Sequence, residues 1–590
     1  MKTFLQSFLG SLLAVVLALA GFFAFFMILV ASMGPKPPVV PSKAVLILNL
    51  NRDLLDGNSE DDPAVAIQKA IGGDLSQDTP LPMLIQALDK ASDDPKISGL
   101  FITGNLRGGG AAALLELRQA LLRFEKKKSV ISYNQTWGRG ELYLCSGLGK
   151  IIVNSFGAID ITAPSANLMF FSKAFDKYGI QVQVTKVGKY KSAVEPFIQD
   201  QMSAENREQV RAYLEEIWNG MVSEIANGRK LEPEYIQRLA NTKGLMSAIE
   251  AKDTNIVDQL AYYDEVLDEL KKLAGKDATS KDFPQISIET YAKIPTAPIK
   301  SRNRIAVVVA EGTIVDGEGG SGEIGGDSLA RELRALRTNS NVKAVVLRVN
   351  SPGGSAMASD VILREVIALK KEKPLVVSMG NLAASGGYWI STYADYIFAE
   401  PGTLTGSIGV FGMFPNAKKL ANNHGITFDS VQLTKIGNPS LFRPMNSEEQ
   451  QRAQALVDYV YSQFLEKVSD GRKINNVNAV HEIAQGRVWT GRRAVDLKLV
   501  DELGGLDVAI AHAAKLAKIE DDYRVDKPKA PQSPMERFMK AFGGSEKRKL
   551  AKIGTFDATK NELMDVAQQL RSLNDPNGIY ALAPIGISIK

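Results

Sequence analysis

A serine at position 407 lies in a stretch that could present its hydroxyl group to a substrate. Four glycines surround it within the segment 400–412, namely Gly402, Gly406, Gly409 and Gly412. Glycine lets the backbone turn sharply and approach a ligand closely. Most serines in such turns only bond neighbouring backbone groups, so the local pattern does not define a reactive site by itself. A reactive Ser407 would also need a nearby base, because an unassisted hydroxyl is a poor nucleophile.

Lys191 is the candidate base. Histidine is the usual choice, but the three histidines are widely separated and none stands in a triad pattern. A lysine can take the proton when burial and neighbours lower its pKa from ~10.4 toward ~7–8. The alternative is that Lys191 is a surface cation, as most lysines are. Lys189 is a rival base, and its charge would help to lower the pKa of Lys191 if the two amines were close.

An oxyanion hole would be the third part of such a site. Backbone N–H groups in a glycine turn between a strand and a helix can hold developing negative charge. Gly353 and Gly354 stand between a strand that ends at Asn350 and a helix that starts near Ala356, although a simple tight turn has the same pattern. Ser385 is a rival nucleophile, because its glycine-flanked segment resembles the serine turn of the Clp protease family, but no histidine is near it.

The elements that must position these residues occur twice, at a spacing of about 245 residues, which indicates a duplicated domain. Short apolar strands are predicted at 44–50, 99–103, 129–132 and 150–153, and again at 305–309, 344–349, 375–378 and 396–399. Amphipathic helices follow around Tyr213 and Tyr461, and the second begins with a capping box at 447–450. Strands that alternate with helices predict an α/β fold with mainly parallel pairing.

The two copies differ at the positions that could do chemistry. Opposite Ser407 the first copy has Thr162, without the flanking glycines, and opposite Lys191 the second copy has Ser440. One copy therefore holds the lysine and the other the glycine-framed serine, which predicts a single site built from two halves.

Composition excludes several other classes of function. One cysteine, Cys145, rules out an internal disulfide and a cysteine-rich metal site, and the three separated histidines do not indicate a zinc site. A net charge of +4 without a basic block does not indicate nucleic-acid binding. We therefore expect no cofactor, no metal ion and no nucleic-acid partner.

The N-terminus predicts a membrane anchor at residues 1–35. The stretch from Phe8 to Val30 is almost wholly apolar, which matches the roughly 20 residues that cross a bilayer as a helix. A cleavable signal peptide has a shorter apolar region of about 7–15 residues. The charges around the stretch do not determine its orientation. We expect repeats at 44–278 and 303–525, a linker at 279–302, and a weakly ordered tail at 526–590 with a helical stretch near 562–573.

Four motifs together resemble the signal peptide peptidase A family, also called protease IV, in its long duplicated form. They are Gly188-Lys-Tyr-Lys-Ser-Ala-Val-Glu-Pro196, Arg348-Val-Asn-Ser-Pro-Gly-Gly-Ser355, Ala383-Ala-Ser-Gly-Gly-Tyr388 and Leu404-Thr-Gly-Ser-Ile-Gly409. The resemblance covers residues 44–525 and the N-terminal anchor. One departure is Lys189, which stands where a neutral residue would be expected.

The resemblance implies a membrane-anchored serine endopeptidase of the Clp/crotonase superfamily, with two tandem Clp/crotonase-like repeats after a transmembrane helix. It assigns the nucleophile to Ser407, the general base to Lys191 and the oxyanion donor to the Gly354 amide. It also implies a homotetramer in the bacterial inner membrane, with the catalytic part in the periplasm, that degrades cleaved signal peptides and other apolar peptides.

Two other functions remain open at this point. A crotonase-type acyl-CoA enzyme would share the fold and the glycine oxyanion hole, but it would not need Ser407 and Lys191 as a pair, and an anchor fits it poorly. A non-catalytic membrane scaffold would use the duplication only to build a ring, and replacing Ser407 would then change nothing measurable.

Overall fold

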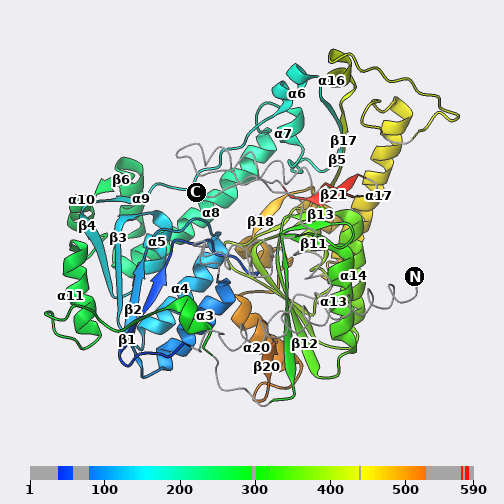
Figure 1. Cartoon of the computed structure of the whole chain (residues 1–590). Helices are drawn as coiled ribbons and strands as arrows, with labels where there is room; N and C mark the ends of the chain where they lie inside the picture. Colours follow the sequence, from blue (N-terminus) through cyan, green and yellow to red (C-terminus); the bar gives the residue numbers. More distant parts are fainter. Residues whose placement is uncertain are drawn as a thin grey trace, which may run out of the picture.

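The chain folds into two α/β bodies that lie side by side (Figure 1). The computed structural model describes residues 38–57, 79–294, 301–320, 322–437, 440–526, 573–575 and 578–583. The first body is drawn in blue to green and the second in green to orange. Each has its own hydrophobic core, so the duplication read from the sequence appears as two mixed α/β units.

The first repeat builds a sheet of seven described strands that is mainly parallel. In sheet order the strands are β6 (Leu245–Ser247), β4 (Lys150–Asp160), β3 (Val130–Trp137), β2 (Ile97–Thr103), β1 (Ala44–Asn49) and β8 (Gln285–Ser287), with β7 (Gln259–Leu260) beside β4. All four predicted strands of this copy are present. Helices α3 (Leu81–Asp93) and α4 (Ala111–Glu125) pack together on it and bury their leucine-rich faces.

The second repeat repeats this arrangement in a sheet of eight described strands. In sheet order they are β18 (Val488–Thr490), β16 (Leu404–Gly406), β14 (Leu375–Ala384), β12 (Val342–Ser351), β9 (Arg304–Glu311) and β20 (Arg524–Asp526). In addition, β15 (Tyr396–Ala399) pairs with β14, and β19 (Glu502–Leu503) pairs with β15. Helices α13 (Gly326–Thr338), α14 (Ala356–Lys370) and α20 (Leu506–Leu516) pack against it.

A third sheet joins the two repeats, and the sequence did not predict it. Its order is β11 (Glu323–Gly325), β10 (Thr313–Val315), β13 (Gly353–Ser355), β21 (Ile579–Leu582), β17 (Val410–Asn416) and β5 (Gln181–Val187). Strand β5 belongs to the first repeat, and it pairs antiparallel with β17 of the second along the whole length of both strands. Because of this pairing, the residues that follow β5 in the first repeat lie beside the residues that precede β17 in the second.

Two long helices flank this junction, α8 (Ala204–Arg229) and α17 (Ser447–Gly471). Ser203 caps α8 by accepting a hydrogen bond from the Asn206 amide. The capping box of α17 starts at Asn446, one residue before the predicted Ser447, because the Asn446 side chain accepts from the Glu449 amide. Both helices bury an apolar face, as their spacing predicted.

Two segments that were predicted to lie outside the repeats contain ordered elements. Residues 285–292, inside the predicted linker, form β8 and α12 (Ile288–Ala292), and β8 extends the first sheet by pairing with β1. Residues 579–582, inside the predicted weakly ordered tail, form β21. The prediction was wrong there because four apolar residues carry too little periodicity to reveal a strand whose partners lie far away in the chain. The helical stretch predicted in this tail falls almost wholly outside the described residues.

The predicted membrane anchor at 1–35 also lies outside the described residues. Among the residues that the structure does describe, no helix has both the length and the apolar character needed to span a bilayer.

Candidate active site

The structure brings Lys191 of the first repeat and Ser407 of the second repeat together within one chain. The Lys191 Nζ lies 3.2 Å from the Ser407 Oγ and 3.1 Å from the Ser407 carbonyl oxygen. Both side chains are fully buried. These are the two residues that the sequence proposed as base and nucleophile, and each is contributed by the copy that was expected to hold it.

Strand pairing explains how two residues so far apart in the chain meet. Ser407 lies in the turn between β16 and β17, and its φ of 48° is in the left-handed region. Lys191 follows β5, the strand that pairs with β17, so the ladder carries it toward the serine turn. The segment around Gln485 and Gly486 supports the lysine turn, because the Tyr190 amide donates to the Gln485 carbonyl oxygen at 3.0 Å.

Lys191 is fully buried, and burial disfavours the charged form of its amine. The amine is removed from water, and among the described residues no carboxylate pairs with it, so desolvation holds its pKa well below the usual value. A neutral amine has two N–H donors and one lone pair. The donors can bond the Ser385 Oγ at 2.7 Å and the Ser407 carbonyl oxygen, which leaves the lone pair to accept the Ser407 hydroxyl proton. The arrangement suits general-base activation of Ser407.

Ser385, the rival nucleophile, lies on the other side of the same amine. It is fully buried between β14 and a short helix (α15, Gly386–Trp389), and its φ of 56° is also in the left-handed region. Its Oγ is the nearest partner of the Lys191 Nζ. Sequence reasoning named this residue but not this contact, because the segment 383–388 is equally compatible with a nucleophile and with a hydrogen-bond partner of the base.

Gly354, the predicted oxyanion donor, lies in β13 directly before α14. Gly353 and Gly354 have φ values of 95° and 157°, which side chains rarely adopt, and a Cβ on Gly354 would lie 1.9 Å from the Ile314 carbonyl oxygen. Glycine is therefore required for the backbone path of this turn. The assignment of the oxyanion amide to Gly354 stays a prediction.

The remaining residues singled out by the sequence lie outside the dyad. Thr162 bonds Asp160 at the exposed end of β4, and Ser440 is exposed in a loop. Lys189 is exposed, with its amine 5.2 Å from the Tyr190 ring. It does not lower the pKa of Lys191, for which burial is the cause. The condition under which Lys189 would lower the pKa of Lys191 is therefore not met, and its role as a rival base stays untested.

A buried charge cluster links the two repeats. Arg348 of β12 is fully buried and bonds Asp56 at 2.9 Å and Glu116 of α4 at 2.6 Å, both from the first repeat. Burial opposes the Arg348 charge, but the two carboxylates outweigh it and raise its pKa. Burial and Glu116 raise the pKa of the neighbouring Glu400 to about 8. This cluster was not recognised from the sequence as an inter-repeat contact.

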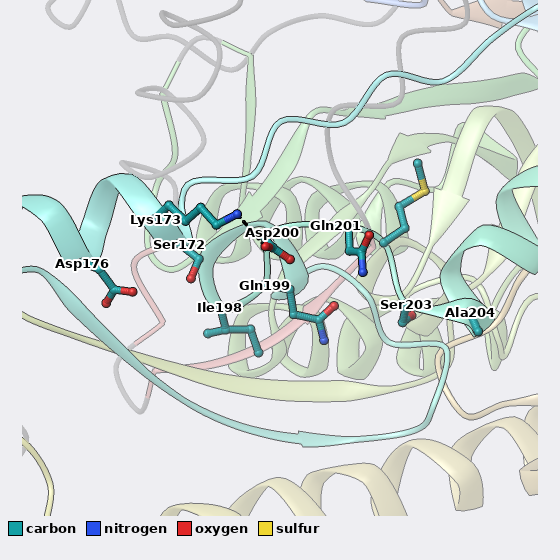
Figure 2. A pocket seen from close by; sticks show the side chains of 10 residues that line it. Ser172, Lys173, Asp176, Ile198, Gln199, Asp200, Gln201, Ser203 and Ala204 are labelled. Carbon is teal, nitrogen blue, oxygen red and sulfur yellow. Dashed lines mark ion pairs between the residues drawn. The ribbon is translucent and has the colours of Figure 1, made fainter.

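A surface hollow of about 600 Å³ lies apart from the dyad, between α6 (Ser172–Tyr178), α7 (Glu195–Ile198) and the start of α8 (Figure 2). Figure 2 shows Lys173 reaching toward Asp200, to which it is paired at 2.7 Å. Neither Lys191 nor Ser407 lines this hollow. Within the described part of the chain, no group of three or more histidine, cysteine, aspartate or glutamate side chains could hold a metal ion.

Comparison with known proteins assigns the family. Residues 122–277 and 367–520, one segment in each repeat, match peptidase family S49. The chain belongs to this family. It is 37% identical over 527 residues to Protease 4 of Haemophilus influenzae, covering 85% of each chain. It is 34% identical to Protease 4 of Salmonella typhi, covering 92% of this chain and 90% of the relative. It is also 30% identical over 450 residues to the chloroplastic serine protease SPPA of Arabidopsis thaliana, covering 74% of this chain and 66% of the relative. The resemblance drawn from the four motifs is thus confirmed.

Proposed function

We propose that this S49 peptidase is a serine endopeptidase in which Ser407 is the nucleophile and Lys191 is the general base. The observation that carries the proposal is a fully buried amine with a depressed pKa, 3.2 Å from a serine hydroxyl in a strained glycine turn. Burial without a carboxylate partner keeps the amine neutral and able to accept a proton.

The reaction follows from this geometry. The Ser407 Oγ attacks the peptide carbonyl carbon while its proton passes to the Lys191 Nζ, and the carbonyl oxygen becomes negatively charged. Collapse of this intermediate breaks the C–N bond, and Lys191 returns the proton to the departing amine. Water, deprotonated by Lys191, then hydrolyses the acyl-enzyme and restores Ser407. The Gly354 amide is proposed to hold the oxyanion in both steps.

We further propose that the substrates are extended, apolar peptides such as cleaved signal peptides. The strands beside Ser407 support this, because Phe411 and Met413 of β17 pack with Val194 in a small apolar cluster near the dyad. The apolar N-terminus supports a membrane anchor. Its placement in the bacterial inner membrane, with the catalytic part in the periplasm, is proposed on the resemblance to the family alone. Assembly as a homotetramer is likewise proposed, on the resemblance to the long duplicated form.

The test is peptidase activity of the detergent-solubilised full chain on a signal-peptide-like substrate. Ser407→Ala and Lys191→Ala are expected to lower turnover about a thousandfold or more, while Lys189→Ala leaves it near wild type. Folding is checked by circular dichroism. A wild type that cleaves no peptide, or a Ser407→Ala variant with full activity, would refute the proposal and favour the scaffold.

A further inference from the structure

Gln209 is a polar residue on the buried face of helix α8. Only 2% of its surface is exposed, and its neighbours on that face include Val210 and Tyr213. Burying a side-chain amide costs free energy unless its donors and its acceptor find partners. A leucine or a methionine at this position would avoid that cost. The partners of the amide therefore indicate what the glutamine does.

The Gln209 amide bonds the chain on both sides of Lys191. Its Nε2 donates to the Tyr190 carbonyl oxygen at 3.1 Å and to the Ser192 Oγ at 3.2 Å. Both neighbours are buried together with the lysine in the turn 188–192, the lysine turn. A carbonyl oxygen only accepts hydrogen bonds, so the contact with Tyr190 fixes which end of the amide faces this turn.

The other end of the amide bonds the second repeat. The Gln209 Oε1 accepts a hydrogen bond from the Val488 amide at 3.2 Å, at the first residue of β18. Strand β18 pairs with β16, the strand that leads into Ser407. In the same segment, the Arg487 carbonyl oxygen accepts from the Ser407 backbone amide at 2.7 Å. One side chain of the first repeat is thus bonded to the two pieces of backbone that hold Lys191 and Ser407.

A second polar residue of α8 holds Gln209 in this orientation. The Asn206 Oδ1, one helical turn earlier, accepts from the Gln209 Nε2 at 3.2 Å, and the Asn206 Nδ2 donates to the Glu195 carboxylate at 2.9 Å. Glu195 is almost fully buried and also accepts from the Ser203 hydroxyl at 2.6 Å. The start of α8 and the segment 190–195 therefore share one buried polar network. Such a network is rigid when its members are bonded.

We propose that Gln209 is a positioning residue for the base of the dyad. It sets how far the lysine turn lies from the backbone that carries Ser407, and it keeps the turn closed against water. It acts through the chain beside Lys191 and not on the reacting atoms. The role rests on the proposed function of Lys191, but closure of the turn can be measured without any peptidase activity.

This role differs from structural support in its effect on the folded molecule. Burial is the cause of the depressed pKa of Lys191, and the side chains bonded to its amine are two uncharged serines, Ser385 and Ser407. If the lysine turn opens, water reaches the amine and its pKa rises toward the ordinary value. The acid limb of the kcat/KM profile then moves to higher pH. A residue that served only the stability of the fold would lower the amount of folded enzyme and leave the profile unchanged.

The activity test replaces Gln209 by methionine, which has a similar length and no amide. Gln209→Met is expected to lower kcat at pH 7 about ten- to a hundredfold with little change in KM. The acid limb should move to higher pH, so that much of the loss is recovered toward pH ~10. If kcat and the melting temperature fall together while the pH profile stays in place, Gln209 is only structural and the proposal is wrong.

Gln237→Leu is the matched control. Gln237 also bonds a residue of α8, because it accepts from the Trp218 indole N–H at 2.6 Å, but its own amide donates to Asn241 and not to the lysine turn. This variant should keep the wild-type kcat and the wild-type pH profile. A shift of the acid limb in Gln237→Leu as large as that in Gln209→Met would show that any loosening of α8 has this effect, and would overturn the specific role of Gln209.

Hydrogen exchange separates the positioning role from the peptidase function. It is followed by mass spectrometry of the full chain, in peptides that cover residues 188–195 and 485–488. Exchange in both is expected to be at least about tenfold faster in Gln209→Met than in wild type, and unchanged in Gln237→Leu. Unchanged exchange in Gln209→Met would overturn the proposal even if Lys191 proves to be the base. Faster exchange, with a wild type that cleaves no peptide, would support closure of the turn by Gln209 and refute the proposed function.

Ser192→Ala is the second variant, for the case that Gln209→Met does not fold. It removes one acceptor of the Gln209 amide and leaves the bonds to the Tyr190 carbonyl oxygen and the Val488 amide in place. Exchange in residues 188–195 should then rise above that of Gln237→Leu, and the acid limb should move in the same direction by a smaller amount. A Ser192→Ala variant with wild-type exchange and a wild-type pH profile would contradict the proposal.

Discussion

Replacement of Ser385 by alanine distinguishes the roles of the two serines that contact the Lys191 amine. The Ser385 Oγ lies 2.7 Å from the Lys191 Nζ in a site from which water is excluded. Ser385→Ala removes this acceptor and leaves one N–H of the amine without a partner. If Ser385 positions the base, the base remains but its orientation toward Ser407 is lost.

The expected magnitude follows from the burial of this contact. Leaving a buried donor unsatisfied costs about 1–3 kcal/mol. If the whole cost falls on the transition state, kcat decreases by a factor of about 5 to 150. KM should change little, because the contact is made by the base and not by the peptide. An acceptor beside the amine also favours its protonated form, so its loss lowers the pKa of Lys191 further. The acid limb of the kcat/KM profile should therefore move to lower pH.

The assay is hydrolysis of an internally quenched apolar peptide over a range of pH. Ser391→Ala is the matched control, because Ser391 is equally buried but donates to the Gly387 carbonyl oxygen and not to the dyad. We expect this control to retain near wild-type kcat and an unchanged pH profile. A serine-reactive phosphonylating reagent should still label the Ser385→Ala variant at Ser407. If Ser385→Ala is as inactive as Ser407→Ala and takes up no label, Ser385 is the nucleophile and our assignment is wrong.

Three further predictions concern the support of the site and the junction between repeats. Gly486→Ala should abolish most activity, because its Cβ would lie 2.6 Å from the Lys191 backbone nitrogen. Gly425 has a similar φ but open space around it, so Gly425→Ala should not abolish activity. Peptide hydrolysis compares the two variants. Between the depressed folded pKa of Lys191 and ~10.4, the unfolded chain holds a proton that the folded chain lacks, so this residue makes stability rise with pH. In denaturant unfolding, Lys191→Met should have a larger free energy of unfolding than wild type at pH 7, and this difference should shrink toward pH ~10. A difference that stays constant with pH would contradict the inference that the buried Lys191 amine is neutral. Arg348→Met should destabilise the fold by about 3–5 kcal/mol by leaving two buried carboxylates without their partner. Arg334 is partly exposed, so Arg334→Met should lower the free energy of unfolding by no more than about 1 kcal/mol. Similar shifts in melting temperature for Arg348→Met and Arg334→Met would refute this reasoning.

The sequence predicted the parts of the fold that depend on local pattern. Each of the eight predicted strands lies within or overlaps an observed one, because a buried parallel strand is a continuous apolar run that stands out between polar turns. The pairing of Lys191 with Ser407 was also accessible, since duplication made the two copies comparable position by position. Comparing the two copies showed which residue each one lacks, and the pattern of a single repeat would not show this.

What the sequence did not predict depends on pairing between distant segments. Strand β5 and strand β21 both find their partners more than a hundred residues away, and no periodicity in Ile579–Leu582 indicates which edge it joins. The contact of Ser385 with Lys191 was hidden for another reason: a buried serine in a strained turn can be a nucleophile or an acceptor, and its sequence pattern does not place the Lys191 amine beside it.

The division of the dyad between the two copies has a consequence for stoichiometry. Each copy lacks the residue that the other supplies, with Thr162 and Ser440 exposed at the reciprocal positions. If Ser407 and Lys191 act as proposed, a chain with two family repeats has one reaction centre. Titration with an irreversible serine reagent should therefore reach an end point at one equivalent per chain. The repeats are also bound to one another by the ladder of β5 and β17, so a half-length chain would present an unpaired strand edge instead of a working half.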